Sequence, residues 1–164
     1  MKVITEFEID TTIAVLEGND EQEMVQMVEM FQVEQPDLVA YIMGGDMPLF
    51  TAVEREIMLY LSLVIWKTLE VAHFGTDIKK IDASILKMEE ESNWEVLDGE
   101  EDTPIFSEKI APLYEGYDQE DLLAFVEDAI AESNGAFEKE AREPMFVMMK
   151  AVVDAFKFVL ADAA

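Results

Sequence analysis

The sequence lacks the side chains on which many enzymes and metal sites depend. It has no cysteine, which excludes disulfides, thiolate metal sites and cysteine nucleophiles and fits a reducing compartment. Its single histidine, His73, excludes a histidine-rich metal centre. Glycine-rich phosphate-binding motifs and a nucleophile elbow are absent as well. We therefore predict no catalytic residue and no cofactor, and the sequence does not favour an enzyme.

Basic residues are also scarce. Two arginines and nine lysines are too few for the clustered positive charge that binds DNA, RNA or anionic lipid. The longest uncharged apolar run, residues 57–66, has ten residues, whereas a membrane span needs about 20. The N-terminus has neither the basic start nor the apolar core of a signal peptide. These absences predict a cytoplasmic protein that binds neither nucleic acid nor membrane directly.

Negative charge is what the chain has in excess. Its 37 Asp and Glu residues outnumber 11 Lys and Arg residues, which gives a net charge of -26 over 164 residues. A compact state with this charge repels itself, so the acids serve a partner or environment, or a strong core tolerates them. Hydrophobic residues make up 51% of the chain, which excludes disorder and predicts one domain with a substantial core.

Start and stop signals along the chain predict an all-α bundle or array of about six to eight helices in a single domain, residues 1–164. Two capping boxes, in which Asp or Thr is followed three residues later by Glu, open amphipathic segments. The predicted helices, with the residues that open or end them, are 11–17 (Asp10, Gly18), 21–34 (Asp20 with Glu23), 36–43 (Pro36, Gly44), 52–73 (Thr51 with Glu54, Gly75), 78–91 (Asp77), a short one between Thr103 and Pro112, 119–133 (Asp118, Asn134), and a last one ending near 161. We expect the helix at 52–73 and the last helix, both long and apolar, to be central.

Three local details qualify this pattern. Residues 3–9 alternate loosely between polar and apolar and are predicted as a short extended stretch. Residues 89–103 contain eight acids and no base, and are predicted as a solvated acidic loop. Pro144 either kinks the last helix or lies in its first turn.

Two pairs of segments resemble each other. Residues 24–31 can be laid on 122–129, and residues 54–58 on 141–145, and each member of the second pair leads into a long apolar helix. The implied halves are 20–75 and 118–162, linked by 76–117, which contains the acidic loop. Apolar helices also resemble one another by chance, and the sequence leaves both explanations open.

The only two arginines occur in the same pattern, Arg-Glu-x-Met, where a long apolar helix begins. Arg55 with Glu56, and Arg142 with Glu143, are therefore the candidate ligand-binding or partner-binding residues. The guanidinium groups can bind an anionic ligand or a partner's carboxylates. They can equally pair with the chain's own acids and tie helices together, and the abundance of acids favours this structural interpretation.

Glu70 and His73 have a Glu-x-x-His spacing that places two metal ligands on one helical face. Carboxylate-bridged metal sites of this kind need a second such motif, which the chain lacks. We therefore predict no metal site and interpret His73 as a residue favoured near a helix C-terminus.

Methionine is frequent, with eleven residues. They fill irregular gaps between helices or form a flexible, adaptable partner surface, and we favour the first role. The Met residues that recur along helices are Met24, Met27 and Met30, and Met145, Met148 and Met149.

These observations predict a protein–protein interaction or regulatory module without catalysis, whose protein partner is basic if charge selects it. The alternative hypothesis is an acidic nucleic-acid mimic or an immunity-type inhibitor of a basic partner. A carboxylate or metal enzyme that uses Glu70 and His73 is the second alternative. The sequence leaves open whether the protein forms a homo-oligomer.

Overall fold

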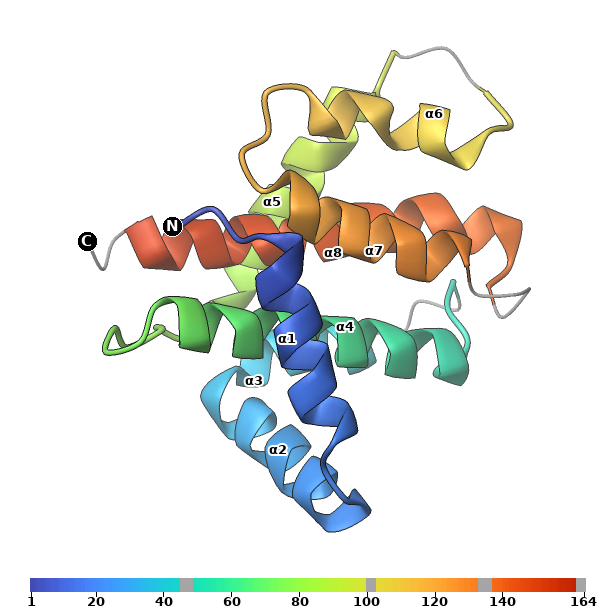
Figure 1. The fold of residues 1–164 in the computed structure, drawn as a ribbon. Helices are drawn as coiled ribbons and strands as arrows, with labels where there is room; N and C mark the ends of the chain where they lie inside the picture. Colours follow the sequence, from blue (N-terminus) through green and yellow to red (C-terminus); the bar gives the residue numbers. More distant parts are fainter. Residues whose placement is uncertain (45–48, 100–102, 133–136, 162–164) are drawn as a thin grey trace.

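Helices make up all the regular structure that the computed structural model describes, in residues 1–44, 49–99, 103–132 and 137–161 (Figure 1). The α-helices are α1 (Glu6–Glu17), α2 (Glu21–Glu34), α3 (Pro36–Met43), α4 (Ala52–Ala72), α5 (Ala83–Leu97), α6 (Phe106–Ile110), α7 (Glu120–Ala131) and α8 (Lys139–Ala161). A short 3-10 helix, η1 (Ala111–Tyr114), follows α6. The predicted all-α class and the number of helices are confirmed.

Local signals open α2, α3 and α4 where the sequence predicts. Asp20 and Glu23 form a reciprocal capping box at the start of α2, and Thr51 and Glu54 form another at α4. Pro36 occupies the first turn of α3, where its missing N–H costs nothing. These helix starts depend on residues within a few positions of one another, and so they can be read from the sequence.

The prediction for the N-terminal segment is wrong in two respects. Residues 3–9 are not an extended stretch, because α1 already begins at Glu6, and Asp10 lies inside this helix rather than capping it. Thr5 is the N-cap, and it exchanges side-chain and backbone hydrogen bonds with Glu8. This capping box outweighs the loose alternation of polar and apolar residues around it.

The prediction for α5 is also wrong at both ends. The helix begins after Asp82, whose side chain accepts a hydrogen bond from the backbone N–H of Ser84, and not after Asp77. It continues to Leu97, so residues 89–97 of the predicted acidic loop 89–103 are helical. Residues 100–102 of that loop lie outside the described part of the chain.

A buried glutamine between α2 and α3 explains the late start of α5. The side-chain amide of Gln35 donates to the backbone carbonyl of Lys79 at 3.2 Å and accepts from the backbone N–H of Ile81 at 2.9 Å. Gln35 is fully buried, and both bonds hold the segment before α5 in a non-helical conformation. A side chain more than 40 residues away therefore outweighs the local capping signal of Asp77.

Packing against α8 explains why the acidic half of α5 is helical. Leu86 and Asn93 of α5 are buried, and Asn93 is hydrogen-bonded to Lys150 and Asp154 of α8. Burial and the nearby charge of Asp154 raise the pKa of Glu89, while Lys150 and Lys157 on α8 oppose that shift. Glu89 thus lies near positive charge that is far away in the sequence, which a count of the charges in this segment does not reveal.

The last predicted helices agree with the structure in outline. Helix α7 starts at Glu120, with Gln119 as its N-cap instead of Asp118, and the expected break at Asn134 lies outside the described residues. Pro144 lies inside α8, in its second turn, beyond the first-turn position where proline is readily accommodated. The hydrogen bond that its nitrogen would have donated is absent, and α8 nevertheless continues to Ala161.

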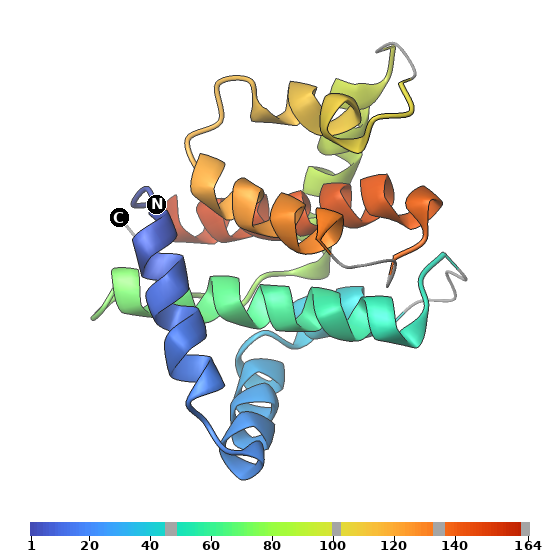
Figure 2. The ribbon, with the colours of Figure 1, turned by 45° about the vertical axis from the view of Figure 1, so that its right-hand side comes forward.

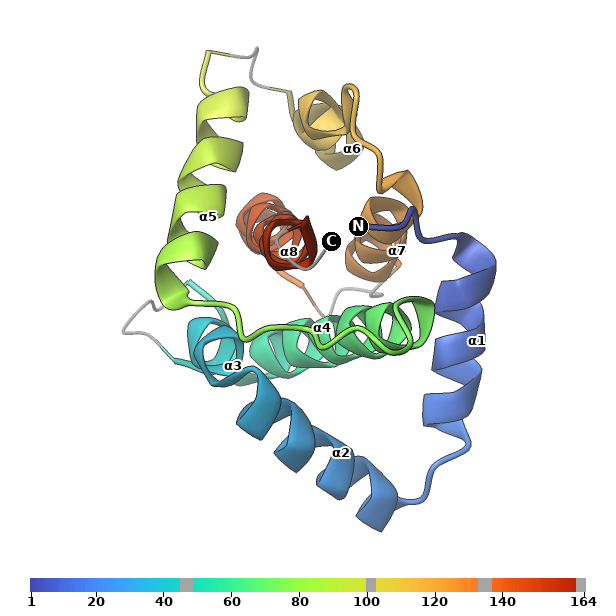
Figure 3. The ribbon, with the colours of Figure 1, turned by 90° about the vertical axis from the view of Figure 1, so that its left-hand side faces the viewer.

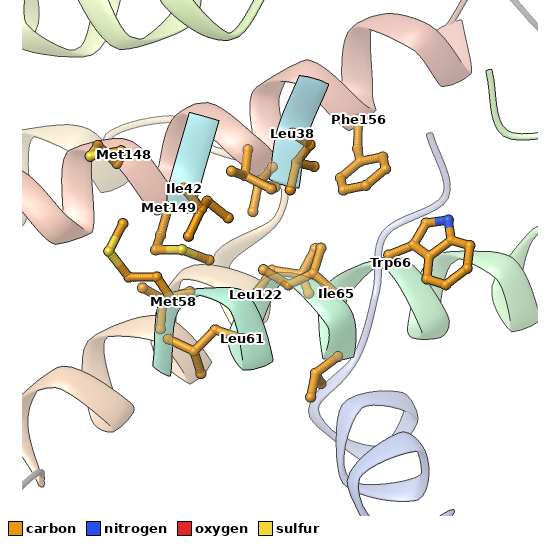
Figure 4. Close-up of a cluster of buried hydrophobic side chains, with 14 of the residues drawn as sticks. Leu38, Ile42, Met58, Leu61, Ile65, Trp66, Leu122, Met148, Met149 and Phe156 are labelled. Atoms are coloured by element: carbon orange, nitrogen blue, oxygen red, sulfur yellow. The ribbon is translucent and has the colours of Figure 1, made fainter. Parts of the chain in front are cut away.

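One hydrophobic core joins the described helices. Helix α8 contributes fourteen buried residues and α4 contributes ten. Figure 3 views α8 nearly end-on, with α4, α5, α6 and α7 around it, and each of these helices packs on it. Figure 4 shows side chains from α3, α4, α7 and α8 meeting in this core, among them Leu38, Met58, Leu122 and Met149.

Helices α4 and α8 begin at the same end of the molecule (Figures 1 and 2). A hydrogen bond joins these two ends, since the buried carboxylate of Glu54 accepts from the backbone N–H of Glu138 at 3.3 Å. The similar segments of the sequence fall on α2 and α7 and on α4 and α8. The internal duplication and the single-domain organisation stay predictions.

The N-terminal segment is tied to the body of the protein by side chains. Gln119, fully buried, accepts a hydrogen bond from the backbone N–H of Ile4 at 3.0 Å and donates to the carbonyl of Lys2 at 3.0 Å. The backbone N–H of Lys2 also donates to His73 at the end of α4, at 3.3 Å. Helix α1 therefore starts from an anchored position and packs across α4 and α7 (Figure 1).

Candidate functional site

The two arginines occupy the same position in their helices but face different elements. Arg55 is the fourth residue of α4, and Arg142 is the fourth residue of α8. Arg55 reaches the C-terminal end of α3, whereas Arg142 lines a cavity beside α6. The structure therefore does not bring the two guanidinium groups into one pocket.

Arg55 has a structural role. Its Nη1 donates to the carbonyl of Ile42 at 2.8 Å and to that of Gly44 at 3.1 Å. The guanidinium also lies 5.9 Å from the ring centre of Phe50. The carbonyls at the end of α3 have no partner within the helix, and Arg55 satisfies two of them.

Arg142 has different surroundings. Its Nε–H is buried without an acceptor, and within the described part of the chain no hydrogen bond or ion pair holds its guanidinium. It lines a cavity of about 430 Å³ between α6 and the start of α8. An unpaired arginine is unexpected in a chain with 37 acids, and the sequence gives no sign of it.

The acids that follow these arginines differ as well. Glu56 is exposed on α4. Glu143 lies beside the same cavity as Arg142, with its Oε2 3.5 Å from the Nζ of Lys109. The acid that sequence reasoning missed is Glu54, which is buried and links the starts of α4 and α8.

Glu70 and His73 are engaged by separate partners. Glu70 forms an ion pair of 2.5 Å with Lys67 on the same helix. The Nε2 of His73 accepts the hydrogen bond from Lys2, and burial, the N-terminal ammonium group and Lys2 lower the pKa of His73. Among the described residues, no three His, Asp or Glu side chains gather where they could hold a metal ion.

A groove between α1, α2 and α4 has a mainly apolar surface. It has a volume of about 360 Å³. Its rim carries Phe7, Val15 and Val71, whose exposed fractions are 78%, 62% and 73%. Phe74, 95% exposed, continues the apolar surface beyond Val71. Figure 3 shows the three helices that enclose the groove.

The polar groups at the groove are already paired with one another. Thr68 lies 2.9 Å from Thr12 at the buried floor, and Thr12 donates to the carbonyl of Glu8. The two charged groups of the lining, Glu8 and Lys67, form ion pairs with Lys2 and Glu70. What the groove offers a ligand is therefore apolar surface.

The helices that form two sides of the groove are strongly acidic. Helices α1 and α2 contain four acids each and no base. The acids are Glu6, Glu8, Asp10 and Glu17 on α1 and Glu21, Glu23, Glu29 and Glu34 on α2. An apolar groove is thus set in a negative surface.

Sequence reasoning could have found this groove. Phe7, Thr11 and Val15 are spaced by four residues, which places them on one face of a helix. Starting the helix at residue 11 left Phe7 outside it and hid the stripe. Met27, one of the repeated methionines, also lines the groove, whereas Met145, Met148 and Met149 are buried in the core.

A buried polar network joins α5, α8 and the segment before α7. Lys150 donates to Asp154 at 2.7 Å and to Asn93 at 2.9 Å. Tyr117 donates to Asp154 at 2.7 Å, and burial followed by the charge of Asp154 raises the pKa of this phenol above its usual range. The Nζ of Lys150 lies 4.3 Å from the ring centre of Tyr117. The network satisfies its own members, as expected of a structural element.

Comparisons with protein-family models, curated proteins and solved structures find no significant match. No helix of the described chain is long and apolar enough to cross a membrane.

Proposed function

We propose that this protein is an interaction module that binds a basic, amphipathic helix of a protein partner in the groove between α1, α2 and α4. The observation that carries the proposal is the group of exposed apolar residues Phe7, Val15 and Val71 around that groove. Removing such side chains from water contributes about 1.5–3 kcal/mol for each one that is fully buried. Binding of an apolar helix face in a hydrophobic groove is a common mode of peptide recognition.

The chemistry of the groove supports binding rather than catalysis. Its floor hydroxyls are bonded within the protein, and its charged groups are ion-paired. A reaction needs a group that can exchange a proton or attack a substrate, and such a group must reach the reacting atoms. The groove instead presents apolar side chains that fit Leu, Ile or Met residues of a partner.

Charge selects the partner. Helices α1 and α2, which form two sides of the groove, contain eight acids and no base. Positive residues flanking the apolar face of a partner helix would meet these acids and steer the encounter. A second copy of this chain would bring another net charge of -26, so electrostatic repulsion opposes self-association through the same groove.

The proposal can be tested with a labelled synthetic helix in which Leu recurs every three or four residues among Lys, so that one face is apolar and the other basic. A scrambled peptide of the same composition, without the apolar face, is the charge control. We expect the amphipathic peptide to bind more tightly, and its binding to persist in 0.5 M NaCl, where the Debye length is only about 4 Å. Fluorescence anisotropy measures both affinities.

Variants of the protein make the test specific to the groove. Phe7→Ser and Val71→Ser are expected to weaken binding at least tenfold, whereas Val53→Ser, which changes a similarly exposed valine elsewhere on α4, leaves it unchanged. Equal binding of the two peptides, or no effect of Phe7→Ser, contradicts the proposal and supports the acidic mimic, whose binding depends on total charge. A dimer in sedimentation experiments that Phe7→Ser dissolves would show that a second copy occupies the groove, which also overturns the proposal.

A further inference from the structure

The cavity beside Arg142 is lined by more positive than negative side chains, in contrast to the acidic helices beside the apolar groove. The cavity beside Arg142 is lined by three cations, Lys109 from α6 and Lys139 and Arg142 from α8, and by two acids, Glu140 and Glu143. Three positive charges and two negative charges leave +1 in a chain whose net charge is -26. Lys109, Lys139 and Arg142 are three of the protein's eleven basic residues.

Four other cavities of the described chain lack this excess of positive side chains. In the apolar groove Glu8 balances Lys67. The charged residues that line the other three are all acids. At physiological ionic strength the Debye length is about 8 Å, so a ligand in the cavity responds mainly to the nearest charges. The cavity beside Arg142 is therefore a place where this acidic protein can hold an anion.

The two acids of the cavity leave Arg142 and the exposed Lys139 accessible to a ligand. Glu143 lies 3.5 Å from Lys109, which offsets its charge. Glu140 is exposed and can turn toward water, and Lys139 is exposed as well. Neither acid pairs with Arg142, although both lie within two residues of it in the sequence.

Among the residues that line the cavity, Arg142 has a buried donor that a bound anion could satisfy. Its Nε–H is buried without an acceptor, and no described residue forms a hydrogen bond or ion pair with its guanidinium. A buried donor without a partner is destabilising. Arg55, at the same position of α4, is instead bonded to the end of α3, so the corresponding helix position alone does not explain an unpaired arginine.

We propose that this cavity binds the phosphoryl group of a small phosphate monoester. The guanidinium of an arginine can hold two phosphate oxygens at once, and the exposed ammonium group of Lys139, from the same cavity lining, adds a second positive charge. Two such cations suit a dianion with three terminal oxygens better than a carboxylate, which has one charge and two oxygens. Phe106 and Pro104 add an apolar wall, and the volume leaves room for the organic part of an ester.

Inorganic phosphate and phenyl phosphate are suitable probes. Titration of the isotope-labelled protein at constant ionic strength, balanced with NaCl, can be followed by NMR. We expect saturable shifts of the Arg142 Nε–H signal and of the backbone signals of residues 139–143. Phenyl phosphate should bind more tightly than inorganic phosphate because its ring contacts Phe106, and equal affinity of the two contradicts the assignment to an ester.

Substitutions of the two arginines provide a matched comparison. Arg142→Gln should weaken phosphate binding at least tenfold, and Arg142→Lys should have an intermediate effect because it keeps the charge without the planar fork. Arg55→Gln should leave binding unchanged. If Arg142→Gln disturbs folding, the exposed Lys139→Gln variant replaces it, again with weaker binding expected. The proposal is overturned if no saturable shift occurs, or if the wild type and Arg142→Gln bind phosphate equally.

Discussion

Lys150 and Asp154 form an ion pair of 2.7 Å, one turn apart on α8, in which only 9% and 11% of the two side chains are exposed. A pair so deeply buried is stabilising only while both partners are present, since each charge has lost its water. Asn93 and Tyr117 complete its hydrogen bonds and connect α8 to α5 and to the segment before α7.

The first prediction concerns this pair. Lys150→Met should lower the free energy of unfolding by about 3–5 kcal/mol because it leaves the carboxylate of Asp154 buried without its cation. The double variant Lys150→Met with Asp154→Asn should cost less than the sum of the single changes. Urea denaturation of the four proteins measures this coupling, and strictly additive effects would show that the pair does not act as a unit.

The second prediction concerns the buried amide of Gln35. Gln35→Leu removes the partners of the Ile81 N–H and the Lys79 carbonyl and should cost about 2–3 kcal/mol of stability. Gln22→Leu changes an exposed glutamine on α2, the helix that ends just before Gln35, and should stay within about 0.5 kcal/mol of the wild type. Faster hydrogen exchange at Ile81 would locate the effect, and unchanged exchange would contradict it.

The third prediction compares the two arginines in the absence of any ligand. Arg55→Gln should lower the free energy of unfolding by about 1 kcal/mol, because the carbonyls of Ile42 and Gly44 lose a charged donor. Arg142→Gln should not lower it, since this guanidinium has no partner to lose within the described chain and the substitution removes a buried donor without an acceptor. Thermal and urea denaturation test the order, and a larger loss for Arg142→Gln would contradict the assigned roles.

The fourth prediction concerns pH. Burial lowers the pKa of His73 below its ordinary value of 6.5, so the folded state binds this proton less readily than the unfolded chain does. The contribution of His73 to stability is therefore complete above pH 6.5 and is lost as the pH falls through the lowered pKa. Protonation also removes the acceptor for the Lys2 N–H.

His73→Gln is the matched variant for this test, because an amide oxygen can accept the same hydrogen bond without titrating. The difference in the free energy of unfolding between the wild type and His73→Gln should shift against the wild type from pH 7.5 to 5.5. Carboxylates titrate in both proteins, so their effect cancels in the comparison. Parallel pH profiles would contradict the prediction.

Local chemistry made much of the fold predictable. The capping boxes at Asp20 and Thr51, and Pro36 at the start of α3, fix helix starts through neighbouring residues. The start of α5 depends instead on the hydrogen bonds of Gln35, which cannot be predicted from the residues next to α5. Glu89, in its acidic half, lies near Lys150 and Lys157 of α8, which are distant in the sequence. The error at α5 therefore occurs where distant side chains outweigh a local signal, whereas the error at α1 comes from a local capping box, Thr5 with Glu8, that was overlooked.

The candidate sites were predictable to different degrees. The matching positions of Arg55 and Arg142 can be read from the sequence, but only the structure shows that one is bonded and the other is not. The groove depends on α1 starting at Glu6, because that start places Phe7 on the same helical face as Val15. The error in the predicted start of α1 was therefore enough to hide the apolar groove.

The hydrogen bonds between Gln119 and the N-terminal segment have a consequence for the order in which the protein matures. They join residues that are 115 and 117 positions apart. During synthesis, Lys2 and Ile4 leave the ribosome long before Gln119 does, so these two bonds form only after α1 and α4, which pack on each other, have both emerged. Residue 119 thus completes the attachment of a segment that was made more than a hundred residues earlier.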